Sequence, residues 1–183
     1  KFKQAYGFKT LRTQDPAEVM RRIWAAPTFE VHGLVGGYHG PGVKTVVPGH
    51  GELKVSMRLV PNQTPEKAFA LLKKHVAKLN PEVTVEREGM LHPFRGVFDG
   101  PYVDAVKRAV KAGFGKEPAF IREGGSIGAV VTMQKAWKVP ILFMGLSLPE
   151  HGYHAPNEYF DWGQASGGMK AFVHYFAELA AKR

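Results

Sequence analysis

GELKVSMRLV, residues 51–60, decides the fold of the first part of this chain. Every second side chain from Leu53 onward is apolar and the intervening ones are mostly polar, which predicts a half-buried β-strand. Thr64-Pro65-Glu66 then gives the signals of a helix start, and apolar residues follow at helical spacing until Asn80-Pro81 ends the pattern. The sequence therefore predicts a small sheet with a helix packed on one face.

Other segments of this first part carry weaker patterns of the same kinds. They predict a helix opened by a capping box at Asp15-Pro16-Ala17-Glu18, a strand at 28–35 that runs into a glycine-rich loop, a strand around Val83 and Val85, and an extended piece at 93–98. These elements together make the first part, residues 1–98, a strand and helix arrangement.

A second part, residues 99–183, begins near Asp99 and reads differently. We expect helices from Pro101, over 126–138 and after the capping Asp161, and a strand at Val139-Pro-Ile-Leu-Phe-Met144 that is covered on both faces. The side chains expected to face inward are Val103, Val106, Val110 and Phe114 in the first helix and Met169, Phe172, Val173, Phe176 and Leu179 in the last. Gly163, Gly167 and Gly168 weaken the last helix, which indicates close backbone packing there. The predicted fold class is α/β (α+β).

Composition excludes several classes of protein. The 183 residues are 44% hydrophobic and 22% charged, without an apolar stretch long enough to span a membrane. There is no cysteine, so any metal must be held by His, Asp or Glu, and a cytoplasmic location is expected. The net charge of +9 comes from dispersed Lys and Arg, which favours solvated helix surfaces over a nucleic-acid groove. The start at Lys1, without an initiator Met or signal peptide, predicts a fragment.

Three stretches carry polar groups that suggest chemistry, and each has a structural alternative. Arg122-Glu-Gly-Gly-Ser-Ile127 would let a backbone approach a ligand and bind an anion, or would be a tight turn with Ser126 as a helix cap. In Pro149-Glu-His-Gly-Tyr-His-Ala-Pro-Asn-Glu158, His154 is a reasonable zinc or manganese ligand with His151, Glu150 and Glu158 as supporting partners, or else a capping or surface His. Arg58 could pair with a substrate carboxylate, or be a solvated or cross-strand-paired Arg. The loop before Lys44-Thr45 fails the phosphate-loop spacing.

Four segments in this order resemble the M20 metallopeptidase family, the carnosinase-like dipeptidases of the acetylornithine deacetylase and succinyl-diaminopimelate desuccinylase superfamily in particular. They are Gly42-Val-Lys-Thr-Val-Val-Pro48, Arg58-Leu-Val-Pro61, Arg122-Glu-Gly-Gly-Ser-Ile127 and His154-Ala-Pro-Asn-Glu158. The resemblance implies a catalytic α/β domain with two bridged metal ions and an inserted lid or dimerisation domain. Residues 1–98 would then be the later part of the lid, and residues 99–183 the C-terminal segment of the catalytic domain.

The resemblance also implies roles for single residues. His154 matches the family's final metal ligand, Arg58 and Thr45 match lid residues that reach the substrate in the partner subunit, and Gly125 and Ser126 match a substrate-contacting loop. His92 matches a further substrate-contacting His across a gap. Gly128 departs from the family pattern, which continues with Pro.

The family's other metal ligands, its general-base Glu and its oxyanion-stabilising His have no counterpart in this chain. For the complete enzyme the resemblance implies two ions of zinc, manganese or cobalt, a small peptide or N-acyl amino acid as substrate, and a homodimer. The missing N-terminal half is a further expected partner; no nucleic acid or membrane is expected. For the fragment alone we expect negligible metal affinity and no hydrolysis. The alternative is a lid-derived dimerisation or binding module that needs no metal.

Overall fold

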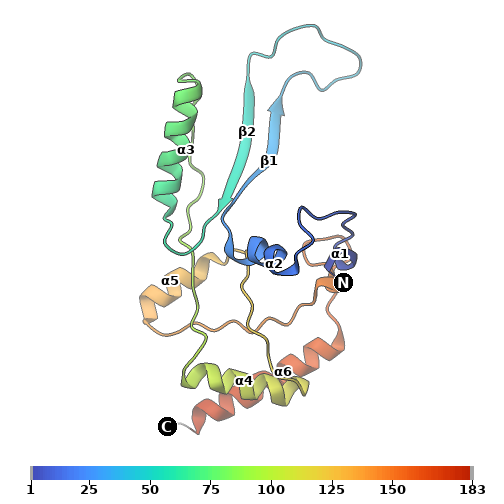
Figure 1. Cartoon of the computed structure of the whole chain (residues 1–183), viewed down its shortest axis with the longest axis vertical. Coiled ribbons are helices and arrows are strands. Elements are labelled where there is room, and N and C mark those ends of the chain that lie inside the picture. The colour runs from blue at the N-terminus through green and yellow to red at the C-terminus, as the bar shows by residue number, and fades with distance from the viewer. Residues whose placement is uncertain (1, 182–183) are drawn as a thin grey trace. The chain divides into compact units, whose positions relative to one another are not determined.

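The computed structural model in Figure 1 describes residues 2–181 of the chain. Its elements are α1 (Phe2–Ala5), α2 (Pro16–Ala25), β1 (Thr28–Gly36), β2 (Gly51–Arg58), α3 (Pro65–Leu79), α4 (Pro101–Phe114), α5 (Gly128–Trp137), the 3₁₀-helix η1 (Pro149–His151) and α6 (Trp162–Ala180). They fall into two compact units. Residues 17–94 and 123–128 form the hairpin unit, and the residues up to 16, 95–122 and those from 129 onward form the helical unit.

The hairpin unit is built on the antiparallel pair β1 and β2, as predicted for both segments. Thr28 pairs with Arg58 at one end and Gly36 with Gly51 at the other, where a long loop joins the strands. The register shifts between Val31 and Gly33, so β1 contains a bulge. Strand β2 ends at Arg58, two residues before the predicted end. Arg58 therefore lies at the open end of the hairpin, away from the connecting loop.

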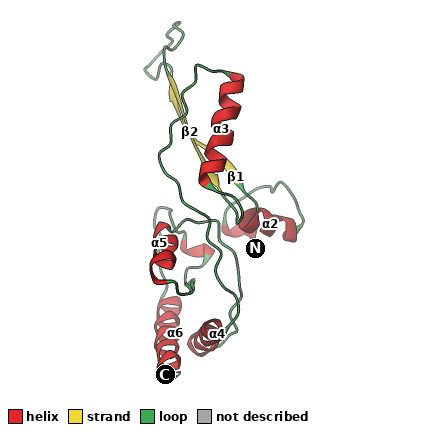
Figure 2. Cartoon of the chain, turned by 90° about the vertical axis from the view of Figure 1, so that its left-hand side faces the viewer, coloured by secondary structure: helices red, strands yellow, loops and turns green. Residues whose placement is uncertain are grey.

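Helix α3 forms where the sequence predicts it. The Thr64 hydroxyl accepts a hydrogen bond from the Lys67 backbone N–H at 3.3 Å, which satisfies one of the free donors of the first turn. At the other end Asn80 takes an extended conformation and ends the helix. In the two views of Figures 1 and 2, α3 runs alongside the hairpin, so the unit is a small antiparallel sheet accompanied by a helix.

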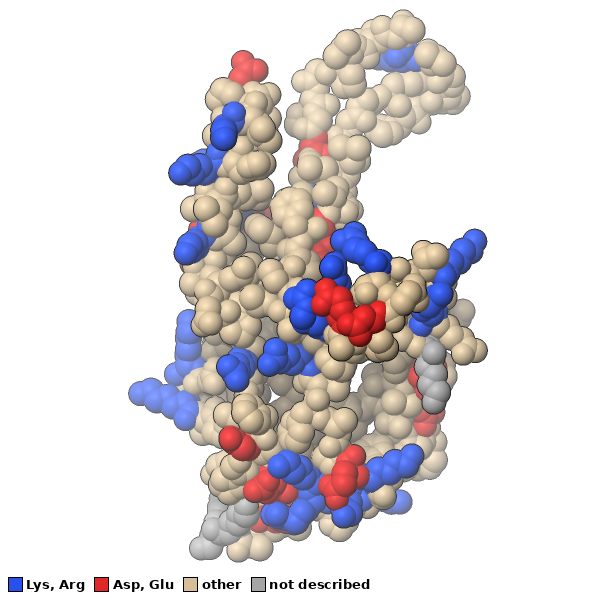
Figure 3. All heavy atoms as spheres, viewed as in Figure 1, with Lys and Arg blue, Asp and Glu red and all other residues tan. Residues whose placement is uncertain are grey.

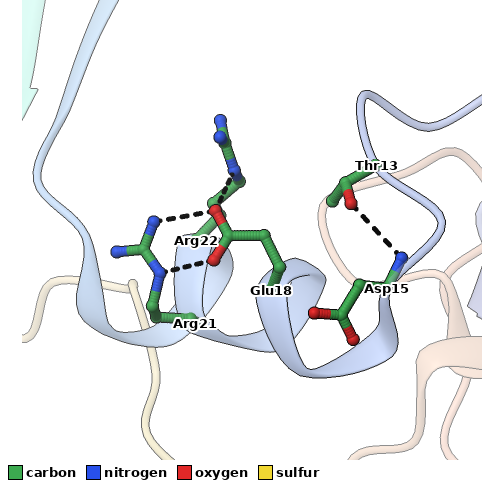
Figure 4. Close-up of polar contacts among 5 residues, drawn as sticks. All are labelled: Thr13, Asp15, Glu18, Arg21 and Arg22. Carbon is green, nitrogen blue, oxygen red and sulfur yellow. Dashed lines mark hydrogen bonds and ion pairs between the residues drawn. The ribbon is translucent and has the colours of Figure 1, made fainter.

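The predicted capping box of α2 is wrong in its side-chain contacts (Figure 4). The Glu18 carboxylate does not reach back to Asp15; it accepts hydrogen bonds from Arg21 and Arg22 at 2.6 to 2.8 Å. The Asp15 N–H donates instead to the Thr13 hydroxyl at 3.2 Å. The guanidinium groups of Arg21 and Arg22 lower the pKa of Glu18 to about 2. Hydrogen bonds from charged guanidinium groups are stronger than one from a backbone N–H. This explains why the Glu18 carboxylate binds Arg21 and Arg22 rather than Asp15.

The remaining predicted strands do not form. Residues 83–85 and 139–144 are irregular, and the sheet within residues 2–181 has two strands. The extended piece expected at 93–98 joins neither strand of that sheet. The run at 139–144 is not covered on both faces either, since Phe143 is 55% exposed. A strand is held by ladder hydrogen bonds to a neighbour. Their apolar patterns are real, but in the part of the chain that is described they lie beside no partner strand.

The helical unit is centred on the contact between α4 and α6. Gly115 ends α4 in the left-handed conformation at φ 70°, and the Asp161 side chain caps α6 by accepting the Gln164 N–H at 2.9 Å. Both ends match the predictions. The buried residues of these two helices are small or β-branched: Val103, Ala105, Ala109, Gly167, Gly168 and Ala171.

Glycines bring the two helices together, as the sequence indicated for the last helix. A Cβ added at Gly113 would collide with the Gly167 carbonyl and approach the Ala171 backbone, and one at Gly167 would collide with the Phe114 ring. The inward face predicted for α6 is wrong, however. The glycine face packs on α4, which turns the large apolar side chains outward, and Phe176 is 64% exposed.

No helix among residues 2–181 is long and apolar enough to cross a membrane.

Gly113→Ala tests this contact. In an ordinary helix the substitution would stabilise by about 1 kcal/mol, but here the added methyl meets backbone that cannot move without separating α4 from α6. We expect a net loss of about 1 to 3 kcal/mol, measured by chemical or thermal unfolding. The matched control is Ala112→Gly at the neighbouring exposed position, which changes helix propensity alone. A Gly113→Ala chain as stable as the wild type would refute the close contact.

Candidate functional site

Arg58 and Ser126 meet in the hairpin unit, although 68 positions separate them in the sequence. The Arg58 Nη1 donates a hydrogen bond of 2.7 Å to the Ser126 Oγ. Arg58 is the last residue of β2, and its backbone N–H donates to the Thr28 hydroxyl at 3.3 Å, so the base of the side chain is fixed by the hairpin. The structure thus brings together two residues that the sequence proposed separately as substrate contacts. Arg58 as a whole is exposed to solvent.

The glycine turn before α5 already holds an anion. The Glu123 Oε1 accepts the N–H groups of Gly124 at 2.9 Å and Gly125 at 3.3 Å. Ser126 is not the helix cap, because α5 begins two residues later and the Ser126 hydroxyl accepts from Arg58. The turn is therefore a set of backbone donors that fits a carboxylate. Sequence reasoning missed the Glu123 contact, although an acid directly before two glycines was a usable signal.

Thr45 and His92 are not joined to this pair. Thr45 lies in the exposed loop between β1 and β2, where Lys44 sits 5.9 Å from the Tyr38 ring centroid and the Tyr38 hydroxyl donates to the Pro41 carbonyl at 2.9 Å. The His92 Nε2 lies 3.6 Å from the Glu66 Oε1 of α3. Their proposed substrate contacts stay predictions.

His154 belongs to the helical unit, where it sits on the loop between η1 and α6. Its side chain is exposed and its backbone is left-handed at φ 65°. The His154 N–H donates to the Glu158 Oε2 at 3.3 Å, so Glu158 contacts the backbone of this residue. A left-handed residue other than Gly costs about 1 kcal/mol or more, and such strain is concentrated at functional sites.

His151 does not support His154 as the sequence suggested. Its side chain is 2% exposed and faces away, toward the start of α6. The Nδ1 accepts the Leu148 N–H at 3.1 Å, so the proton of the neutral ring is on Nε2, which donates to the Asp161 Oδ2 at 2.7 Å. Backbone donation from Gln164, followed by the bond from His151, holds the pKa of Asp161 below its ordinary value. The sequence predicted Asp161 as the cap of α6 but not its hydrogen bond with His151.

The donors in this chain do not make up a metal site. Residues 2–181 contain no group of three His, Asp or Glu side chains placed to hold one ion. His154 offers a single exposed imidazole, whereas a catalytic zinc takes three protein ligands. We therefore assign no catalytic step to a metal within this chain.

Comparisons with known proteins identify relatives over most of this chain. A family model described as the peptidase dimerisation domain of M20 proteins matches residues 2–84. The Cys-Gly metallodipeptidase dug1 of Schizosaccharomyces pombe is 32% identical over 98% of this chain and 39% of its own length. The human Beta-Ala-His dipeptidase is 30% identical over 89% of this chain and 33% of its own length.

Solved structures give the same result for the fold. Human carnosine dipeptidase 1 superposes with a TM-score of 0.86 and 27% identity over 98% of this chain and 39% of that one. The metallo-carboxypeptidase Sso-CP2 of Sulfolobus solfataricus has a TM-score of 0.84 and 30% identity, over 95% of this chain and 40% of that one.

These matches define a peptidase-type protein whose residues 2–84 are related to a dimerisation domain. Residues 2–84 match the dimerisation domain of M20 peptidases, and the chain is similar over nearly its whole length to peptidases of that family. It spans about two-fifths of the length of the relatives it matches, 39% for the fission yeast protein. The relatives' names describe metal-dependent dipeptidases and a carboxypeptidase.

The Asp161 carboxylate should make the stability of this chain pH-dependent. Because its pKa is lowered in the folded state, its contribution to the free energy of unfolding is present at neutral pH and is lost as the pH falls through that lowered pKa. Asp161→Asn keeps a capping oxygen but not the charge. We expect the urea midpoint of the variant to lie below that of the wild type at neutral pH and to converge with it in acid. A gap of constant size across the titration would contradict this assignment.

Proposed function

We propose that this chain is the lid and C-terminal part of a dinuclear metal-dependent hydrolase of peptide or amide bonds. Its substrate would be a dipeptide, a short peptide with a free carboxyl terminus or an N-acyl amino acid. The observation that carries the proposal is the Arg58 to Ser126 hydrogen bond, since it places a guanidinium beside the glycine turn. The dipeptidase and carboxypeptidase names of the relatives support the same substrate class.

In this proposal Arg58 recognises the substrate's terminal carboxylate. A guanidinium presents parallel N–H donors that match the two oxygens of a carboxylate. The backbone N–H groups of Gly124 and Gly125 now bind the Glu123 carboxylate, and the same donors, with the Ser126 hydroxyl, would orient the substrate backbone once Glu123 turns away. Thr45 and His92 are proposed as further substrate contacts, with Thr45 acting in the partner subunit.

His154 is proposed as one metal ligand of the complete protein. The remaining ligands and the general base would lie outside this chain, on the missing N-terminal half, and the ions would be zinc, manganese or cobalt. It follows that the chain alone is proposed to be inactive. A cytoplasmic location belongs to the proposal. We place no nucleic acid among the partners, because Lys and Arg on the face in Figure 3 are spread over many elements with acidic side chains among them.

Arg58→Lys in the longer protein, which contains this chain, tests the carboxylate contact. Lysine keeps the charge and loses the paired donors, so we expect kcat/KM for dipeptides to fall about tenfold or more, mainly through KM. A dipeptide whose carboxyl terminus is amidated should be hydrolysed equally by both proteins, because it lacks the recognised group.

Two controls accompany the Arg58→Lys measurement. Arg87→Lys, at an exposed Arg of the same unit, should change neither substrate. The isolated chain, given zinc or manganese, should cleave no dipeptide. An equal loss on the free and amidated dipeptides would remove Arg58 from carboxylate recognition, and hydrolysis by the isolated chain would refute the division of the active site.

A lid-derived dimerisation module is the second candidate, and one observation favours it. The hairpin exposes apolar side chains on both strands, including Val31, Leu34 and Leu53, and Leu34 is 78% exposed. A two-stranded sheet also leaves outer edges free for pairing with another copy. A homodimer through the hairpin requires no metal.

Leu34→Lys should therefore weaken self-association. We expect size-exclusion and sedimentation to give a concentration-dependent dimer for the wild type, unchanged by added metal or chelator, and a monomer for the variant with an unchanged melting temperature. Leu71→Lys, at an exposed apolar position of α3, is the matched control and should stay dimeric. Equal dimerisation of the Leu34→Lys chain would move the interface away from the hairpin.

A further inference from the structure

The loop that carries His154 has three residues with positive φ within six positions, 152–157. Gly152, His154 and Asn157 are all left-handed, at φ 64°, 65° and 62°. Only glycine adopts this conformation without cost, so two of the three positions store strain. Within the loop, the Ala155 N–H donates to the Gly152 carbonyl at 2.9 Å and the Glu158 N–H to the Ala155 carbonyl at 3.3 Å. These turns give the loop its shape but do not fix its ends.

The ends of the loop are fixed by His151. On the early side its Nδ1 accepts the Leu148 N–H, and on the late side its Nε2 donates to Asp161. Its carbonyl accepts the Tyr159 N–H at 3.1 Å. The rings of Tyr159 and Phe160 pack edge-on against the imidazole, with centroids 5.1 and 5.6 Å away. One buried side chain therefore closes the whole segment from 148 to 161.

Asp161 connects this closed segment to a rigid element. One carboxylate oxygen caps α6 through Gln164, and the other accepts from His151. Since α6 is in turn packed on α4 through its glycines, the loop is tied to the core of the helical unit. His154 lies midway between the two anchors, exposed and without a buried contact of its own.

We propose that His151 and Asp161 are a positioning pair that holds the His154 backbone in its left-handed conformation and so aims the imidazole. Neither residue touches a substrate or carries out chemistry. The importance of this aim for metal binding rests on the proposed function of His154, but the conformational claim does not.

Asp161→Asn is the sharpest test, because asparagine keeps the shape and the capping oxygen while an NH₂ group faces the His151 N–H. We expect helix content to be retained, the His154 Cα chemical shift to leave its left-handed value, and amide exchange at Ala155 and Tyr159 to quicken about tenfold while α4 and α6 stay protected. His151→Phe keeps the ring packing but loses the hydrogen bonds to Leu148 and Asp161. We expect the same change in the His154 shift and the same faster exchange in the loop.

Ala112→Gly is the control for a merely structural role, since it weakens α4 at an exposed position and leaves the glycine contact with α6 in place. Unchanged His154 shifts and loop exchange in Asp161→Asn, equal changes in Ala112→Gly, or global unfolding of both pair variants would each overturn the proposal. All measurements use the whole chain without metal. Failure of metal binding or hydrolysis in the longer protein would thus refute the proposed function and leave this result standing.

Discussion

The glycine contact between α4 and α6 is the interaction on which the helical unit depends. Gly113 and Gly167 let the two backbones approach to a distance that any side chain would prevent. This contact fixes α6, and α6 begins at the Asp161 cap. Asp161 holds His151, and His151 closes the loop that presents His154. The close packing at Gly113 and Gly167 thus contributes to the position of His154, which we propose as a metal ligand.

The strands depend on pairing rather than on helix packing, because a β-strand is held by hydrogen bonds to a neighbouring strand. β1 and β2 satisfy each other, whereas the apolar stretches at 83–85 and 139–144 lie beside no strand within residues 2–181. The outward large side chains of α6, such as Phe176, are exposed for a related reason: they match no surface in the described part of the chain. The chain spans 39% of the length of the fission yeast relative.

Each of the two units carries its own group of candidate residues. The hairpin unit supplies a guanidinium, a hydroxyl and backbone donors, which are groups that bind a carboxylate. The helical unit supplies an imidazole on a strained, anchored loop. Recognition of a charged substrate end and coordination of a metal need different chemistry, and we propose the first role for the hairpin-unit residues and the second for His154.

The sequence by itself determined the local elements and the resemblance to M20 peptidases. Alternation at 51–60, the Thr64 and Asp161 caps and the glycines of the last helix each depend on neighbours within a few residues, so their signals are complete in the sequence. It also named Arg58, Ser126 and His154. Only the tertiary structure decided that Arg58 meets Ser126, that Glu123 occupies the glycine turn and that His151 pairs with Asp161. Those contacts depend on which side chains the packing brings within hydrogen-bond distance, and periodicity does not encode that.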